Sequence, residues 1–217
     1  MNMKKCLSIP KSLYYNILFF GIGGVRLPVL FSNSTIIKGA RRGAIVLGKT
    51  HRVHYGFGGS LGIEGNKHSY LLFTTPTGTI RFEGNAELAE GISICINAGE
   101  MTIGDSFACN KNCVFVSNKG IRIGHNTILG WNVSIRDLDG HPILQNGKRV
   151  NEDAEVMIGD HVWIAAHTDI LKGSVIKDGC VVGGRSCVTK SSSSEPNSVL
   201  AGNPAKMIKQ NIEWEVR

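Results

Sequence analysis

The chain has 217 residues, of which 42% are hydrophobic and 19% charged, with 27 glycines and a formal net charge of +7. This balance excludes an intrinsically disordered chain, and the length is enough for one large domain with a sizeable core. A basic excess fits nucleic acid, an anionic membrane or an anionic ligand, but the sequence lacks a basic helix, zinc-finger spacing and an aromatic-studded basic stripe, so nucleic acid is not an expected partner.

Residues 1–35 are predicted to form an N-terminal cap segment. The apolar run from Ile17 to Val25 is shorter than the roughly 20 residues that a membrane-spanning helix needs. Arg26 and Pro28 follow this run directly, and no convincing signal-peptide cleavage site precedes them. A packed cap is favoured, and a segment that docks peripherally on a membrane is the alternative.

A repeat begins weakly after the cap and becomes clearer along the chain. Isolated aliphatic residues near Ile36 and Ile45 alternate with polar residues and glycine, which indicates early, irregular coils. Two later runs, which begin at Ile103 and Ile123, show aliphatic residues at six-residue spacing, and the segment from Leu88 to Ile94 is a fainter copy.

The six-residue spacing fails over residues 136–157, which predicts a loop extruded from a repeating scaffold. Such excursions often carry functional side chains, and this one holds Asp137, Asp139 and His141 within five positions. Imidazole titrates near neutrality and can take the proton of an attacking hydroxyl, while a carboxylate can orient the ring. His141 is therefore a candidate general base with Asp139 beside it, and a solvated loop histidine is the alternative.

From Ile158 onward the period of six is unbroken. The branched aliphatic positions are Ile158, Ile164, Ile170, Ile176, Val182 and Val188, and small residues stand four positions after most of them. Neither an α-helix nor a simple strand alternation has this period. It is typical of a parallel β-helix, in which each unit forms a short strand and a turn and the aliphatic side chains stack inward. A β-helix over residues 36–190 and a C-terminal tail over residues 191–217 are expected.

The six cysteines form no CxxC pair and stand mostly inside these apolar units. In such positions cysteine acts as a small hydrophobic residue, which predicts reduced thiols and a cytoplasmic protein.

Three motifs together resemble the hexapeptide-repeat acyltransferases. They are the segment Asp139-Gly140-His141-Pro142-Ile143, the segment Val162-Trp163-Ile164 and the ending Ala201-Gly202-Asn203-Pro204-Ala205-Lys206. The pattern is similar to the maltose, galactoside and capsular-polysaccharide O-acetyltransferases, over roughly Ile92 to Lys209. The resemblance implies an all-β, left-handed parallel β-helix with short terminal caps. Ala165 replaces the usual glycine of the family, and the linker 191–196 is slightly longer than usual.

The resemblance also implies a reaction and roles for individual residues. A homotrimer would transfer acetyl from acetyl-CoA to a hydroxyl of a sugar or surface-polysaccharide unit, without a metal and without an acyl-enzyme. His141 takes the role of general base, and Asn110, with Asn112 as the alternative, that of the asparagine beside it. The residues implied to contact CoA are Trp163, Ala166, Gly184, Thr189, Lys190 and Lys206.

Two other functions are left open by the sequence. A non-catalytic β-helix could serve as a binding or assembly module. A zinc protein of the γ-type carbonic anhydrase kind needs three histidines, for which His161 and His167 have suitable spacing but lack an obvious third partner. The acceptor is not specified, and serine or an antibiotic are alternatives to a glycan.

Overall fold

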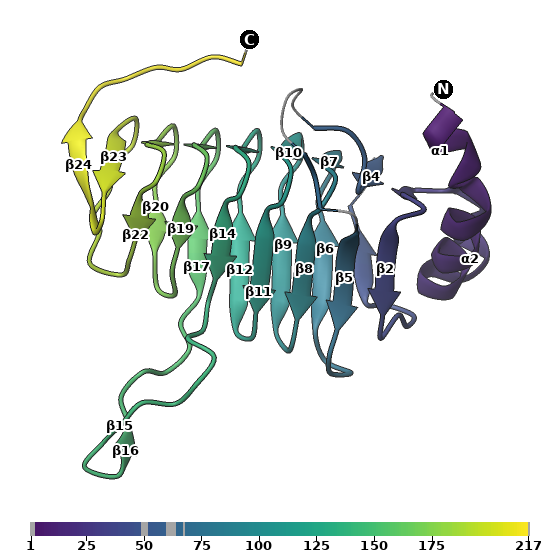
Figure 1. Cartoon of the computed structure of the whole chain (residues 1–217), viewed down its shortest axis with the longest axis horizontal. Helices are drawn as coiled ribbons and strands as arrows, with labels where there is room; N and C mark the ends of the chain where they lie inside the picture. Colours follow the sequence, from purple (N-terminus) through teal and green to yellow (C-terminus); the bar gives the residue numbers. More distant parts are fainter. Residues whose placement is uncertain (1–2, 49–51, 60–63, 67, 217) are drawn as a thin grey trace.

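A computed structural model of the chain describes residues 3–48, 52–59, 64–66 and 68–216. The chain winds through three parallel sheets in turn, so that each coil adds one strand to each of three faces (Figure 1). The prediction of a mostly-β fold of stacked parallel sheets is confirmed, with helices in the N-terminal segment, and the left hand of the β-helix stays a prediction.

The strands are grouped here by face. Face A contains β1 (Val29–Phe31), β4 (Val53–Tyr55), β7 (Ala86–Leu88), β10 (Phe107–Cys109), β13 (Ile128–Leu129), β18 (Trp163–Ile164), β21 (Val181–Val182), β23 (Val199–Gly202) and β24 (Ala205–Lys209). Face B contains β2 (Thr35–Lys38), β5 (Ser69–Phe73), β8 (Ser93–Ile96), β11 (Val114–Ser117), β14 (Ser134–Arg136), β19 (Asp169–Ile170) and β22 (Cys187–Val188). Face C contains β3 (Ile45–Leu47), β6 (Thr79–Phe82), β9 (Glu100–Ile103), β12 (Gly120–Ile123), β17 (Val156–Ile158) and β20 (Val175–Ile176).

The six-residue period corresponds to the interior of the coil. All six aliphatic residues from Ile158 to Val188 are buried, as are small residues such as Thr168 and Ser174. The hydroxyl groups of these small residues donate to carbonyl oxygens, from Thr168 to Gly183 and from Ser174 to Leu171. The polar atoms at the tight corners are therefore satisfied inside the coil.

Neighbouring coils stack closely at corner CA, where the chain passes from face C to face A. Asp178 Oδ1 accepts a hydrogen bond from the Asp160 backbone N–H at 2.8 Å, and Asp160 Oδ1 accepts one from His125 N–H at 2.7 Å. A Cβ on Gly159 would lie 2.1 Å from Asp178 Oδ1, and one on Gly124 would lie 2.3 Å from Asp160 Oδ1. Glycine is required here because the carboxylate of the next coil occupies the space of its side chain.

The N-terminal cap is helical, with α1 (Met3–Leu7), α2 (Ile9–Phe20) and a 3₁₀ helix, η1 (Gly21–Arg26). α2 lies against β1, the edge strand of face A. Ser12 Oγ accepts from Phe31 N–H at 2.9 Å, and Asn16 Oδ1 accepts from Val29 N–H at 3.1 Å. These side chains accept hydrogen bonds from backbone N–H groups of an edge strand, which would otherwise be free to pair with another strand.

Two segments leave the coil. Residues 137–155 project between β14 and β17 and carry an antiparallel hairpin of β15 (Leu144–Gln145) and β16 (Lys148–Arg149) (Figure 1). After β23 the chain turns back in β24, antiparallel to β23, and runs on as an extended tail. Coil strands occur before residue 36, in β1, and after residue 190, in β23, so the division into cap, β-helix and tail at those residues stays a prediction. No helix in the described ranges is long and apolar enough to cross a membrane.

We expect Gly159→Ala to lower the free energy of unfolding by about 1–3 kcal/mol, because the new methyl group collides with the Asp178 carboxylate. Gly23→Ala is the matched control, since a Cβ there meets nothing within 4 Å. Thermal and urea unfolding of both variants measure the difference. Equal stability of the two variants would contradict the close stacking at corner CA.

Candidate active site

The predicted site residues are divided between two corners of the coil. At corner AB, between faces A and B, Asn110 follows β10, Ala166 follows β18 and Gly184 follows β21. At corner BC, His141 lies in the loop that follows β14, and Lys190 follows β22. The fold of one chain therefore separates the predicted general base from the predicted asparagine.

Asn151 organises the loop around His141. Its side chain is 8% exposed, and its Nδ2 donates to the His141 carbonyl oxygen at 2.8 Å and to Asp139 Oδ2 at 2.9 Å. Its Oδ1 accepts from the Ile143 N–H at 2.6 Å. One buried amide thus fixes the backbone on both sides of the histidine. Sequence reasoning missed Asn151, because nothing in the repeat marks a residue ten positions beyond His141.

Asp139 attaches the loop to the next coil. Lys172 Nζ lies 2.6 Å from Asp139 Oδ2 and donates to the Asn151 carbonyl oxygen at 2.9 Å. The hydrogen bond from Lys172 is the largest cause that holds the pKa of the Asp139 carboxyl below its ordinary value, and the hydrogen bond from Asn151 is the second. The His141 ring is exposed, and within the described residues it makes no hydrogen bond. The role of Asp139 as the partner of the imidazole stays a prediction.

Asp137 stabilises the point at which the loop leaves the coil. Its buried carboxylate accepts hydrogen bonds from the Ser117 hydroxyl and from the backbone N–H groups of Asn118, Lys119 and Gly120, at 2.7–2.9 Å. The four donors lie where β11 ends and β12 begins in the preceding coil. Asp137 is therefore a structural cap, although in the sequence it looks like a member of the same acidic group as Asp139.

A groove of about 430 Å³ follows corner AB across successive coils. It is lined by Gly130, Trp131, Trp163, Ala165, Ala166, His167, Gly184 and Arg185. It brings together three of the residues implied to contact CoA. A Cβ on Gly130 would lie 2.6 Å from Ala166 N, so coil backbones meet here without intervening side chains. Such a surface can hold a narrow, extended ligand by backbone hydrogen bonds.

Two side chains of this groove were not predicted. Trp131 stands one coil before His167, and its carbonyl oxygen accepts from the His167 N–H at 2.9 Å. Arg185 stands one coil after Ala166 and donates its backbone N–H to the Ala166 carbonyl oxygen at 3.0 Å. The Arg185 side chain is exposed and has no ion-pair partner in the described part of the chain. Counting residues from coil to coil would have found both positions.

The three remaining predicted donor contacts lie away from this groove. Thr189 Oγ1 shares a hydrogen bond of 2.8 Å with Ser191 Oγ and so stabilises the turn after β22. Lys190 is exposed, and its stem covers Gly173 at corner BC. Lys206 is exposed in β24, opposite Ala201. Any role of these three residues at CoA is still a prediction.

The C-terminal tail supplies a second aromatic residue next to Trp163. The Trp214 ring stacks on His161, with centroids 4.1 Å apart and 7° between planes, and its Nε1 donates to the His161 carbonyl oxygen at 3.1 Å. Trp163 and Trp214 have centroids 6.2 Å apart and border a cavity of about 680 Å³. His161 lies at corner CA and His167 at corner AB, so the two histidines proposed for zinc stand apart. The described residues hold no group of three potential metal ligands.

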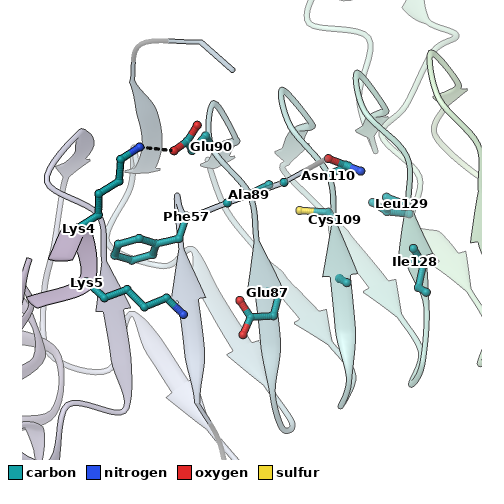
Figure 2. Close-up of a pocket in the computed structure, with 13 residues that line it drawn as sticks. Lys4, Lys5, Phe57, Glu87, Ala89, Glu90, Cys109, Asn110, Ile128 and Leu129 are labelled. Carbon is teal, nitrogen blue, oxygen red and sulfur yellow. Dashed lines mark hydrogen bonds and ion pairs between the residues drawn. The ribbon is translucent and has the colours of Figure 1, made fainter. Parts of the chain in front are cut away.

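Asn110 lines a third cavity, of about 440 Å³, between the cap and face A. Figure 2 shows it with Lys4, Lys5, Glu87 and Glu90 around the opening. The neighbouring alternative, Asn112, is engaged elsewhere. Its Oδ1 accepts from the Asn66 N–H at 2.7 Å, and its Nδ2 donates to the Glu64 carbonyl oxygen at 3.1 Å. Asn110 lines this cavity and Asn112 does not, and the role of either residue at a ligand stays a prediction.

The three-faced parallel β-helix, the extruded loop that carries His141 and the groove along corner AB can be compared with known proteins. No family model matches the sequence. Over 138 residues the chain is 30% identical to a polysialic acid O-acetyltransferase of Escherichia coli O1:K1, covering 62% of this chain and 44% of the relative. It is 29% identical over 144 residues to a putative lipopolysaccharide biosynthesis O-acetyl transferase of Escherichia coli K12, covering 61% and 72%.

Solved structures agree with these matches. The crystal structure of the polysialic-acid-specific acetyltransferase NeuO superposes with a TM-score of 0.59 at 25% identity, covering 86% of this chain and 89% of that chain. An N-acyltransferase from Bacillus cereus, solved with dTDP and coenzyme A, shares the fold at 16% identity and a TM-score of 0.51, covering 84% and 80%. The chain is therefore similar in sequence and fold to sugar and polysaccharide O-acetyltransferases. It spans about half the length, or less, of two of its curated relatives.

We expect Lys172→Met to raise the pKa of Asp139, because it removes the strongest hydrogen bond to the carboxylate. Folding lowers the pKa of Asp139 in the wild type. The contact therefore stabilises the loop fully at pH values above the ordinary aspartate pKa of about 3.9, and this stabilisation is lost as the pH falls through the pKa of the folded state. A carbon-13 NMR titration of the Asp139 carboxyl measures the shift. Lys148→Met, at the exposed hairpin of the same loop, should leave it unchanged, and an unchanged pKa in Lys172→Met would contradict the ion pair.

Proposed function

We propose that this protein is an acetyl-CoA-dependent O-acetyltransferase that acts on a hydroxyl of a sugar or surface-polysaccharide unit. The observation that carries the proposal is His141, an exposed imidazole with no partner in the described residues, on a loop that one buried amide holds in place. The relatives named as polysialic acid and lipopolysaccharide acetyltransferases support the class of acceptor.

In the proposed reaction His141 takes the proton of the acceptor hydroxyl while the oxygen attacks the thioester carbonyl carbon. Imidazole suits this step because its pKa lies near neutral pH. The tetrahedral intermediate collapses with cleavage of the carbon–sulfur bond, and the imidazolium returns the proton to the CoA thiolate. Backbone N–H groups of the coil corner stabilise the oxyanion. No metal and no acyl-enzyme take part in this scheme.

For the donor we propose the groove along corner AB. The pantetheine arm lies along Ala166 and Gly184, and Trp163 contacts the thiol end. Arg185 is added to Lys190 and Lys206 as a partner for phosphate, because a guanidinium can bind phosphate through two parallel hydrogen bonds. The N-acyltransferase of the same fold that was solved with coenzyme A supports this choice of co-substrate.

We propose further that the site is completed between subunits of a homotrimer in the cytoplasm. The His141 loop lies at one corner of the coil, and Asn110 and the groove residues lie at another. In the proposed trimer a neighbouring subunit supplies one of the two sets. Cyclic association lets every chain give its loop to one neighbour and its groove to the other.

Replacement of His141 by Ala should reduce acceptor-dependent thiol release from acetyl-CoA about 10²–10⁴-fold, because the general base is lost. The assay uses a panel of sugars, nucleotide sugars and acidic polysaccharides. Lys148→Ala in the same loop is the matched control and should retain activity. If thiol release persists in His141→Ala, another residue is the base. If the wild type neither releases thiol nor is stabilised against heat by CoA, the non-catalytic binding module is the better description.

Subunit sharing can be tested by mixing two inactive variants. When His141→Ala and Asn110→Ala chains are co-expressed in equal amounts, random trimers contain intact sites wherever a normal His141 meets a normal Asn110 of its neighbour. About a quarter of wild-type activity is expected. Activity no higher than that of the separate variants would place both residues in a site within one chain.

A further inference from the structure

The cap helix α2 has apolar side chains on its exposed face. Its buried face holds Phe19 together with Ser12 and Asn16, which form hydrogen bonds with the edge strand β1. Tyr14, Ile17 and Leu18 are exposed. The exposed face of an amphipathic helix on a globular protein is normally polar. The outer face of α2 therefore fits an apolar surrounding that the coil does not supply.

Exposed apolar side chains also occur in α1 and η1. We call the exposed apolar side chains of the cap the cap stripe, and it consists of Met3, Leu7, Tyr14, Ile17, Leu18, Ile22 and Val25. Ile22 has the most exposed side chain of the set, at 88%. The cap stands at one end of the coil stack, away from the projecting loop and the C-terminal tail (Figure 1). An exposed apolar patch of this kind marks an interaction surface.

The net positive charge of the chain is concentrated in the N-terminal part of the sequence, which includes the cap. Residues 1–63 contain nine lysines and arginines and no aspartate or glutamate, whereas the remaining residues contain fifteen basic and seventeen acidic ones. Two of the arginines lie beside the cap stripe and are exposed: Arg26 ends η1, and Arg42 lies next to Gly21. An apolar stripe with basic flanks is the pattern of a helix that lies in the interface of an anionic bilayer.

Other occupants fit this surface less well. α2 has 12 residues, too few to span a bilayer. A second copy of the chain, docked stripe against stripe, would bring the arginines of the two caps face to face, which is unfavourable. A soluble acidic glycan would match the arginines but leave the aliphatic side chains in water.

We propose that the cap stripe docks the protein peripherally on an anionic membrane surface, with α2 in the interface. This inference goes beyond the proposed catalytic function and does not depend on His141. It would hold the groove and the loop near acceptors that are carried on lipid.

Flotation with phospholipid vesicles tests the docking. The full-length wild type should float with vesicles of phosphatidylcholine containing roughly 30% phosphatidylglycerol at about 0.1 M salt, and float much less with phosphatidylcholine alone or near 0.5 M salt. A triple variant with Tyr14→Ser, Ile17→Ser and Ile22→Ser should partition onto the vesicles about tenfold less than the wild type, because it loses apolar contact with the bilayer. Arg26→Gln/Arg42→Gln should lower binding to the anionic vesicles alone.

Matched controls separate docking from folding and from catalysis. Leu144→Ser/Ile208→Ser replaces side chains of similar exposure far from the cap and should bind as the wild type does. Thiol release with soluble acceptors should be equal in all these variants. Wild type that stays unbound to anionic vesicles, or a triple variant that floats as the wild type does, overturns the proposal. So does a change in solution mass of the triple variant, which would make the stripe a contact between copies of the chain.

Discussion

The close stacking of one coil on the next is the constraint on which the rest of the structure depends. Strands in a sheet lie about 4.8 Å apart, so a corner residue has the backbone of the next coil immediately above it. At Gly124 and Gly159 that space is filled by the Asp160 and Asp178 carboxylates, each of which caps a backbone N–H. The corners are therefore rigid, and a side chain placed on them keeps its position without help from a loop.

That rigidity allows the chain to leave the coil and return in register. Beyond β14 the buried Asp137 takes four hydrogen bonds from the preceding coil, and β17 then resumes pairing with β12 and β20. The excursion itself is held by side-chain contacts, among them those of Asn151, the Lys172–Asp139 pair and the Arg149–Asp153 pair. The catalytic candidate lies on an exposed part of this loop, which leaves its imidazole accessible to a substrate or a neighbouring subunit.

The sequence predicted what depends on the period and missed what depends on contacts between distant residues. Because inward positions recur every six residues, the spacing alone was enough to predict the buried stack from Ile158 to Val188. Asp137 and Asp139 could not be distinguished, since only tertiary contacts make one a buried cap and the other an exposed tether. The cap was expected to pack, but the polar part of its buried face was not expected. The open edge of β1 takes polar partners from Ser12 and Asn16, while apolar side chains of α2 stay exposed.

The distribution of the site residues has a consequence for assembly. A coil held by stacked corners cannot bend to bring the His141 loop at corner BC to Asn110 at corner AB, so under the proposed mechanism one chain would offer two incomplete halves of a site. In the proposed trimer each half meets its complement on a neighbour, and the three coils run parallel. The three caps then point in the same direction, so their apolar stripes and arginines form one surface. Catalysis between subunits and docking at a membrane would follow from the same symmetry, because the axis that joins the half-sites also aligns the caps.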